Sequence, residues 1–130
     1  MIKNYILGIC LIGLLISCQD AKEKAFDSLN QEVMELHDKI MPKSELLTNY
    51  KSKLDSLAKG PDSVHVKKLQ IALEKADQSM MDWMHNFSLD SLDKMDIKSK
   101  LAYLSNQLTE LKNIDQLTDS TLNASKKYIK

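Results

Sequence analysis

The sequence contains no arginine, so all 18 of its basic residues are lysine, and they are balanced by 18 aspartates and glutamates. Proteins that bind phosphates through two hydrogen bonds or recognise guanine bases normally use arginine. Proteins that bind nucleic acid usually also carry an excess of basic charge. Neither feature is present in this chain. The composition therefore predicts no nucleic-acid partner.

Cysteine is also scarce, since only Cys10 and Cys18 occur and both lie near the N-terminus. The rest of the chain has no thiol for a disulfide, a zinc site or a nucleophile. It has no glycine-rich phosphate loop, nucleophile elbow or HExxH motif either. Its carboxylates alternate with lysines at helical spacing, as Glu35 does with Lys39, which is typical of a solvated helix face. We therefore predict that the protein is not an enzyme.

The N-terminus has the pattern of a bacterial lipoprotein precursor. Lys3 provides a positive start, residues 5–16 carry no charge, and Leu15-Ile16-Ser17-Cys18 matches a lipobox. The apolar segment is shorter than the ~20 residues that span a bilayer. The pattern predicts a signal peptide over residues 1–17 and a covalent lipid such as palmitate on Cys18. An uncleaved signal anchor and an ordinary secretory signal cut at another position are the alternatives.

The residues after Cys18 bear on where such a lipoprotein would lie. Gln19 stands where the inner-membrane retention signal would carry Asp, which favours the outer membrane, with the protein facing the periplasm or the cell surface. Residues 18–24 would form the lipidated N-terminus and a short tether, or alternatively a surface-export signal. Residues 25–130 are enough for one small domain with a core, and too few for two.

Apolar side chains recur at intervals of three and four residues over residues 26–57, broken only at Lys43. This spacing places them on one face of a helix. The register continues through Pro42, which predicts one long first helix kinked near residues 38–41, with two separate helices as the alternative. The members of this stripe are Phe26, Leu29, Val33, Leu36, Ile40, Leu47, Tyr50, Leu54 and Leu57.

Two further helical stripes follow the stop predicted at Gly60-Pro61. Asp62 or Ser63 can cap the second helix, over residues 62–87, and Asp96 can cap the third after a polar loop. The core stripes are Val66, Leu69, Leu73, Ala76, Met80, Trp83 and Phe87 in the second helix, and Ile97, Leu101, Leu104, Leu108 and Leu111 in the third.

The third stripe weakens after Leu111, where it falls on Asp115 and Thr118 while Ile114 and Leu117 offer a neighbouring face. No strand-like alternation occurs. The pattern predicts an all-α fold, an antiparallel three-helix bundle with coiled-coil character. Because the first helix is the longest, one of its ends should project or pack on the third helix alone.

Methionines and histidines gather at one predicted level of this bundle. A turn at Gly60-Pro61 brings residues whose numbers sum to about 121 to the same height on the first two helices. The residues near this level are Met34, His37, Met41, Met80, Met81, Trp83, Met84 and His85. Thioether and imidazole groups are the ligands that Cu(I) prefers. The alternative interpretation, which we favour, is that methionine fills gaps in the core around Trp83 as a packing anchor.

Three segments resemble a known family: EVMELHDKIMPK over residues 32–43, MMDWMHNF over residues 80–87, and LAYLSNQ around Tyr103. In order and spacing they are similar to small lipoproteins of Bacteroidetes that carry the label "viral A-type inclusion protein". The resemblance covers most of the chain after the signal. It implies a lipoprotein, but the family has no biochemical activity to carry over.

Two functions follow from these patterns. The first is a non-catalytic scaffold or interaction module, anchored to the envelope, which binds a protein partner or itself through an uncovered seam at residues 47–57. The second is a periplasmic or surface protein that binds Cu(I) through Met34, His37, Met41 and Met84 near Trp83. The first requires no cofactor.

Overall fold

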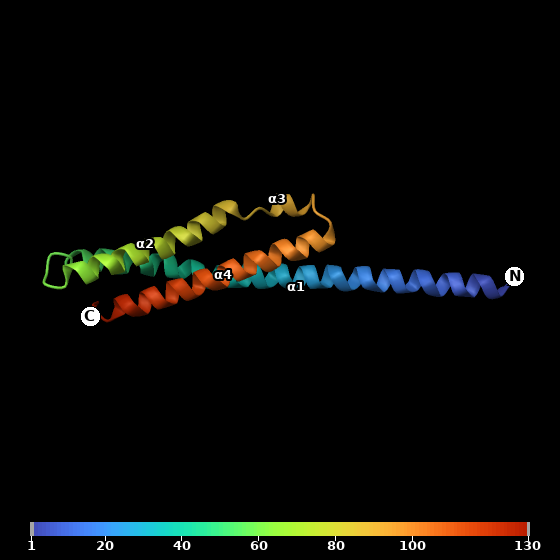
Figure 1. The fold of residues 1–130 in the computed structure, drawn as a ribbon, viewed down its shortest axis with the longest axis horizontal. Helices are drawn as coiled ribbons and strands as arrows, with labels where there is room; N and C mark the ends of the chain where they lie inside the picture. The colour runs from blue at the N-terminus through green and yellow to red at the C-terminus, as the bar shows by residue number, and fades with distance from the viewer. Residues whose placement is uncertain (1, 130) are drawn as a thin grey trace.

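Four helices account for most of the chain in a computed structural model that describes the backbone of residues 2–129 and the side chains of residues 19–129. The helices are α1 (Ile2–Asp55), α2 (Ser63–Asn86), α3 (Leu89–Leu92) and α4 (Ile97–Lys126). Figure 1 shows that α2 returns alongside α1 and that α4 then runs in the direction of α1. Residues 2–129 contain no strand, so the predicted all-α class is confirmed.

The signal peptide expected over residues 1–17 and the lipid expected on Cys18 fall outside the side chains that the structure describes. The backbone of α1 is helical from Ile2. Residues 19–24, expected to form a tether, continue this helix with exposed side chains. Across residues 19–129, none of the helices offers an apolar stretch of the length that crossing a membrane requires.

Helix α1 passes through Pro42 without ending. A proline inside a helix removes one backbone hydrogen bond and costs ~3 kcal/mol, so packing on both sides must hold the helix together. Pro42 itself is exposed, whereas Ile40 and Leu47 are buried on the face toward the other helices. The alternative of two separate helices is therefore wrong.

The core follows a seven-residue spacing. On α1 the fully buried apolar residues are Val33, Ile40, Leu47 and Leu54. They meet the buried side chains Val66, Leu69, Leu73, Ala76, Met80 and Trp83 of α2. Helix α4 adds Leu104, Leu108, Leu111, Ile114, Thr118, Thr121 and Ser125. Each of the three long helices contacts the other two, so the buried faces enclose one another.

The seam expected to be uncovered at residues 47–57 is largely buried. Leu47 and Leu54 are 2% and 0% exposed, and Tyr50 packs against the same cluster. Helix α4 continues to Lys126, and Leu117 and Leu122 pack against this cluster from the α4 side. The prediction of a free seam is therefore wrong, because the weak second half of the third stripe still forms a helix.

The ends of the first two helices differ slightly from the expected ones. Helix α1 ends at Asp55, before Gly60, and tight turns follow in which the Ala58 amide donates to the Leu54 carbonyl at 3.1 Å. The Gly60 amide donates to the Leu57 carbonyl at 3.1 Å. Asp62 occupies the N-cap position of α2, but its side chain makes no capping hydrogen bond.

The polar stretch before α4 contains a helix that the sequence did not predict. In α3, the Ser88 side chain accepts a hydrogen bond from the Ser91 amide, and Leu92 is buried in the core. The cap predicted at Asp96 is confirmed, because its carboxylate accepts from the amides of Lys98 and Ser99 at 2.9 and 3.0 Å. These hydrogen bonds hold the pKa of Asp96 below its usual value.

The second half of α4 buries hydroxyl groups where its first half buries leucines. Thr118 and Ser125 are 1% and 0% exposed, and neither hydroxyl has a hydrogen-bond partner among the described residues. An unsatisfied buried polar group costs roughly 1–3 kcal/mol. The helix is therefore held less tightly near its C-terminal end than near Leu104 and Leu111.

Replacing the Thr118 hydroxyl with a methyl group, Thr118→Val, should raise the free energy of unfolding by about 1 kcal/mol, because it keeps the volume and removes an unpaired group. Urea unfolding followed by circular dichroism measures the change. Thr109→Val is the matched control, since the Thr109 side chain is exposed and donates to the Ser105 carbonyl. An unchanged or lower stability of Thr118→Val would contradict this account.

Candidate functional site

The predicted methionine and histidine level is organised around Trp83. This indole is 3% exposed, and the Phe87 ring stacks on it with ring centroids 4.7 Å apart. The His37 ring of α1 lies beside it with a centroid distance of 5.7 Å. The structure thus brings His37 and Trp83 together from two helices, as the numbering across the turn predicted.

The methionines divide into an inner and an outer group. Met80 is fully buried, and Met41 and Met84 are partly buried against the same core cluster as Trp83. Met34 is half-buried on α1. Met81 is 41% exposed, however, and His85 is exposed as well. Met81 and His85 share the predicted level of the bundle but lie on the outer face of α2, outside this cluster.

His37 has a defined hydrogen-bond partner. Its Nδ1 lies 2.9 Å from Oδ1 of Asp38, and because a carboxylate only accepts, Nδ1 carries the proton. In the tautomer that donates from Nδ1, the lone pair of the ring is on Nε2. A histidine that binds a metal usually donates its other ring N–H to a carboxylate, a backbone carbonyl or a water. Nε1 of Trp83 has no hydrogen-bond partner among the described residues.

An ion-pair network joins α1 to α4 next to this cluster. Lys43 Nζ lies 2.6 Å from one carboxylate oxygen of Asp115 and 2.6 Å from Asp119. Lys39 Nζ lies 2.7 Å from the other Asp115 oxygen. The Lys43 and Asp115 side chains are 18% and 16% exposed, so solvent screens this pair only partly. Further along, Lys112 pairs with Glu32 at 3.3 Å.

The charges in this network shift each other's pKa values. Burial alone would lower the pKa of Lys43, but its hydrogen bonds to Asp115 and Asp119 outweigh this effect and raise the pKa. Burial alone would raise the pKa of Asp115, but hydrogen bonds from Lys39 and Lys43 outweigh it and lower the pKa. Both groups are therefore held in their charged forms at neutral pH.

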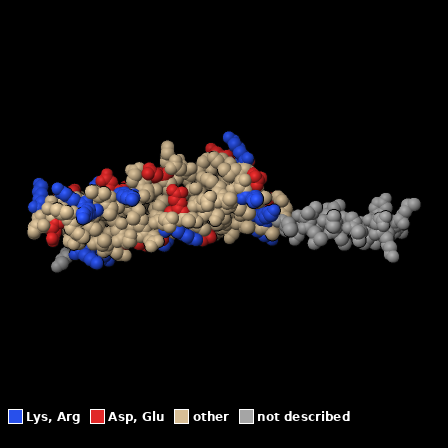
Figure 2. All heavy atoms as spheres, in the orientation of Figure 1, with Lys and Arg blue, Asp and Glu red and all other residues tan. Residues whose placement is uncertain are grey.

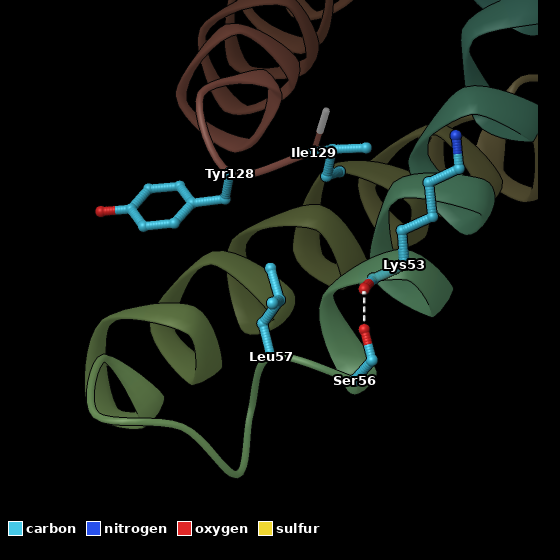
Figure 3. Close-up of a pocket in the computed structure, with 5 residues that line it drawn as sticks. All are labelled: Lys53, Ser56, Leu57, Tyr128 and Ile129. Atoms are coloured by element: carbon cyan, nitrogen blue, oxygen red, sulfur yellow. Dashed lines mark hydrogen bonds between the residues drawn. The ribbon is translucent and has the colours of Figure 1, made fainter.

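A third feature lies at the far end of the molecule from the N-terminus, where the turn between α1 and α2 meets the end of α4. An open pocket of about 460 Å³ is lined by Lys53, Ser56, Leu57, Tyr128 and Ile129. Figure 3 shows Leu57 pointing toward the end of α4 and the Tyr128 ring directed outward. The Ser56 hydroxyl donates to the Lys53 carbonyl at 3.0 Å. Nearby, the exposed His65 ring lies 5.3 Å from the Tyr128 ring.

Residues 19–129 show no group of three or more histidine, cysteine, aspartate or glutamate side chains that could hold a metal ion. The Cu(I) hypothesis instead requires methionine sulfurs and a single histidine, so it does not depend on a group of that composition. Comparison with protein-family models, with curated proteins and with solved structures gives no match for this chain.

The apolar spacing does not predict the ion-pair network, although a signal for it is present in the sequence. Lys43 is the one break in the first apolar stripe, and Asp115 is where the third stripe fails. Opposite charges that interrupt two facing apolar stripes indicate a pair between the helices. The pocket at the far end has no comparable signal, because it depends on where α4 ends relative to the turn.

Removing the Asp115 charge with Asp115→Asn should lower the free energy of unfolding by about 2 kcal/mol at pH 7, since it leaves the half-buried ammonium of Lys43 poorly paired. The folded pKa of Asp115 is depressed, so its contribution is present above the unfolded value of 3.8 and is lost as the pH falls through the folded value. The difference between the two proteins, measured by urea unfolding, should therefore vanish at acid pH.

A double variant controls for the loss of packing. Lys43→Leu combined with Asp115→Leu replaces both charges with apolar groups and should be close to neutral in stability. Glu74→Gln, which removes the carboxylate of the exposed pair with Lys51, should cost much less than Asp115→Asn. An equal cost at both positions would show that the network does not hold the helices together.

Proposed function

We propose that this protein is a bacterial envelope lipoprotein, anchored in the outer membrane by lipid on Cys18, whose helical domain is a non-catalytic scaffold or interaction module. The observation that carries the proposal is the continuity of α1, which is one helix from Ile2 to Asp55. A lipid on Cys18 would then be joined to the domain by a helical segment rather than by a flexible linker. The lipobox and the exposed residues 19–24 support this arrangement.

The domain is better suited to act as a spacer than to carry a catalytic site. The segment from Cys18 to Asp55 would measure roughly 56 Å at 1.5 Å per helical residue. We further propose that the fold is an antiparallel three-helix bundle with coiled-coil character and that α1 bends near Pro42. The seven-residue spacing from Val33 to Leu54 supports the coiled-coil packing.

A surface for partners is available on α2. Ile71 lies on its outer face and is 66% exposed. The resemblance to small Bacteroidetes lipoproteins, carried by the segments around His37 and Trp83, is consistent with an anchored module of this kind. It supplies no activity.

The anchor is tested by growing cells with labelled palmitate and comparing the parent chain with Cys18→Ala. We expect the parent to take up the label and sediment with membranes, because two or three acyl chains hold a protein almost permanently at the bilayer. Cys18→Ala should take up no label and leave the membrane fraction. Cys10→Ala is the matched control and should behave as the parent does. A labelled or membrane-bound Cys18→Ala protein would refute the anchor.

The second candidate is a protein that binds Cu(I) through Met34, His37, Met41 and Met84. It is favoured by one specific observation, the hydrogen bond between Nδ1 of His37 and Asp38, which leaves Nε2 as the ring nitrogen that could bind a metal. The His37 ring itself lies beside Trp83. Met41 and Met84 pack against the same cluster and could supply the soft sulfur ligands that Cu(I) prefers.

Titration of Cu(I) into the purified protein, with the fluorescence of Trp83 as the signal, tests this candidate. If Cu(I) binds here, it should quench the fluorescence, and His37→Ala should weaken the apparent affinity by about tenfold or more, as expected for loss of one ligand. His85→Ala is the matched control, because His85 is exposed on the outer face of α2. Absence of quenching, or equal effects of the two substitutions, would rule out Cu(I) binding at this cluster.

A further inference from the structure

Charge is distributed unevenly along the molecule. We define the distal tip as residues 53–68 and 124–129, which lie together where the turn between α1 and α2 meets the end of α4 (Figure 1). The distal tip contains six lysines and two aspartates. Residues 19–52 and 69–123 contain ten lysines against sixteen aspartates and glutamates. A chain with no net charge is thus basic at one end and acidic over its body.

The lysines of the distal tip are exposed and available to a partner. They are Lys53, Lys59, Lys67, Lys68, Lys126 and Lys127. None of them takes part in an ion pair with another residue whose side chain the structure describes, unlike Lys39, Lys43 and Lys112 on the body. Figure 2 shows several lysine side chains extending from this end of the molecule.

Apolar groups lie among these lysines. Val64 is 70% exposed and Leu57 is 40% exposed, and Tyr128 and Ile129 border the open pocket at the end of α4. In Figure 3 the Tyr128 hydroxyl points away from the body, with the ring beside the end of the helix. Lysines interspersed with aliphatic and aromatic side chains are typical of protein surfaces that bind at the interfacial region of a membrane.

We propose that the distal tip docks on an anionic phospholipid surface. The charge is complementary, since each exposed lysine near such a surface is attracted to it, while the acidic body is repelled. The same asymmetry would orient the molecule end-on. With lipid on Cys18 at the other end, the protein would connect two membrane surfaces, and this second step rests on the anchor proposed above.

The size of the distal tip argues against a protein partner. Three helix ends, each about 10 Å across, present an end face of roughly 300 Å². A stable protein interface buries about 800 Å² on each partner. A lipid surface needs no such area or shape complementarity, because its headgroups rearrange around the lysines. A second copy of this chain, which could offer its acidic body, is distinguished by the experiment.

Vesicle tethering with the full chain tests the proposal. The protein is reconstituted into phosphatidylcholine vesicles and mixed with target vesicles of phosphatidylcholine alone or of phosphatidylcholine with phosphatidylglycerol. We expect clustering, measured by light scattering, only with the phosphatidylglycerol targets, and weaker clustering at high salt. Replacing Lys59, Lys67, Lys126 and Lys127 by Gln should weaken target binding by about a thousandfold.

A matched variant removes the same charge elsewhere. Replacing Lys24, Lys75, Lys94 and Lys98 by Gln changes the net charge equally but leaves the distal tip intact, and it should tether as the parent does. Equal loss in both variants, clustering of neutral targets, or no clustering at all would overturn the proposal. Clustering that requires the protein in both vesicle populations would mean that the distal tip binds a second copy, and would also overturn it.

Failure of the anchor gives a different result. If the protein does not remain on the first vesicles during flotation, the anchor proposal fails. The distal tip is then tested by flotation of the same protein with the phosphatidylglycerol targets alone, where the two lysine variants should again differ. If the two lysine variants float equally well with the phosphatidylglycerol vesicles, docking by the distal tip is refuted, whatever holds the other end of the molecule.

Discussion

The seven-residue spacing of Val33, Ile40, Leu47 and Leu54 is the constraint on which the rest of the structure depends. It keeps a single face of α1 turned toward α2 and α4 over more than twenty residues, because a seven-residue repeat drifts only ~20° per repeat around a straight helix. Apolar burial on both sides of Pro42 offsets the hydrogen bond that the proline removes. Apolar spacing alone, however, would allow a helix to slide by one repeat against its partner.

The charged residues limit this freedom. Lys43 and Asp115 occupy positions where an apolar residue would continue the stripes, and they meet only in the observed register of α1 and α4. A slip by seven residues would leave both side chains half-buried without their partners, which costs far more than an exposed pair gains. The pairs of Lys39 with Asp115 and of Lys43 with Asp119 share one offset of 76 residues. Apolar burial therefore supplies most of the stability, and the ion pairs select one alignment.

Much of this architecture was predictable from the spacing of apolar residues. The three long helices, the cap at Asp96 and the meeting of His37 with Trp83 all follow from local patterns and one turn. Helix α3 and the covered segment near Leu54 were not predictable in the same way. Helix α3 depends on Leu92 packing in a core formed by residues distant in the sequence. The segment near Leu54 is covered because the leucines earlier in α4 fix the rotation of this helix, so that residues with hydroxyl groups such as Thr118 also face inward.

The same rotation of α4 has a consequence at its end. Burying Thr118 and Ser125 on the inner face leaves Lys126 and Lys127 exposed beside the turn between α1 and α2. The rotation of α4 about its own axis therefore determines both which hydroxyl groups are buried and which lysines are exposed at its end. A more apolar second half of α4 would pack more firmly, but the lysines at its end would keep their place. Stability of this half and charge at the distal tip can therefore be varied independently, by substitutions on opposite sides of the same helix.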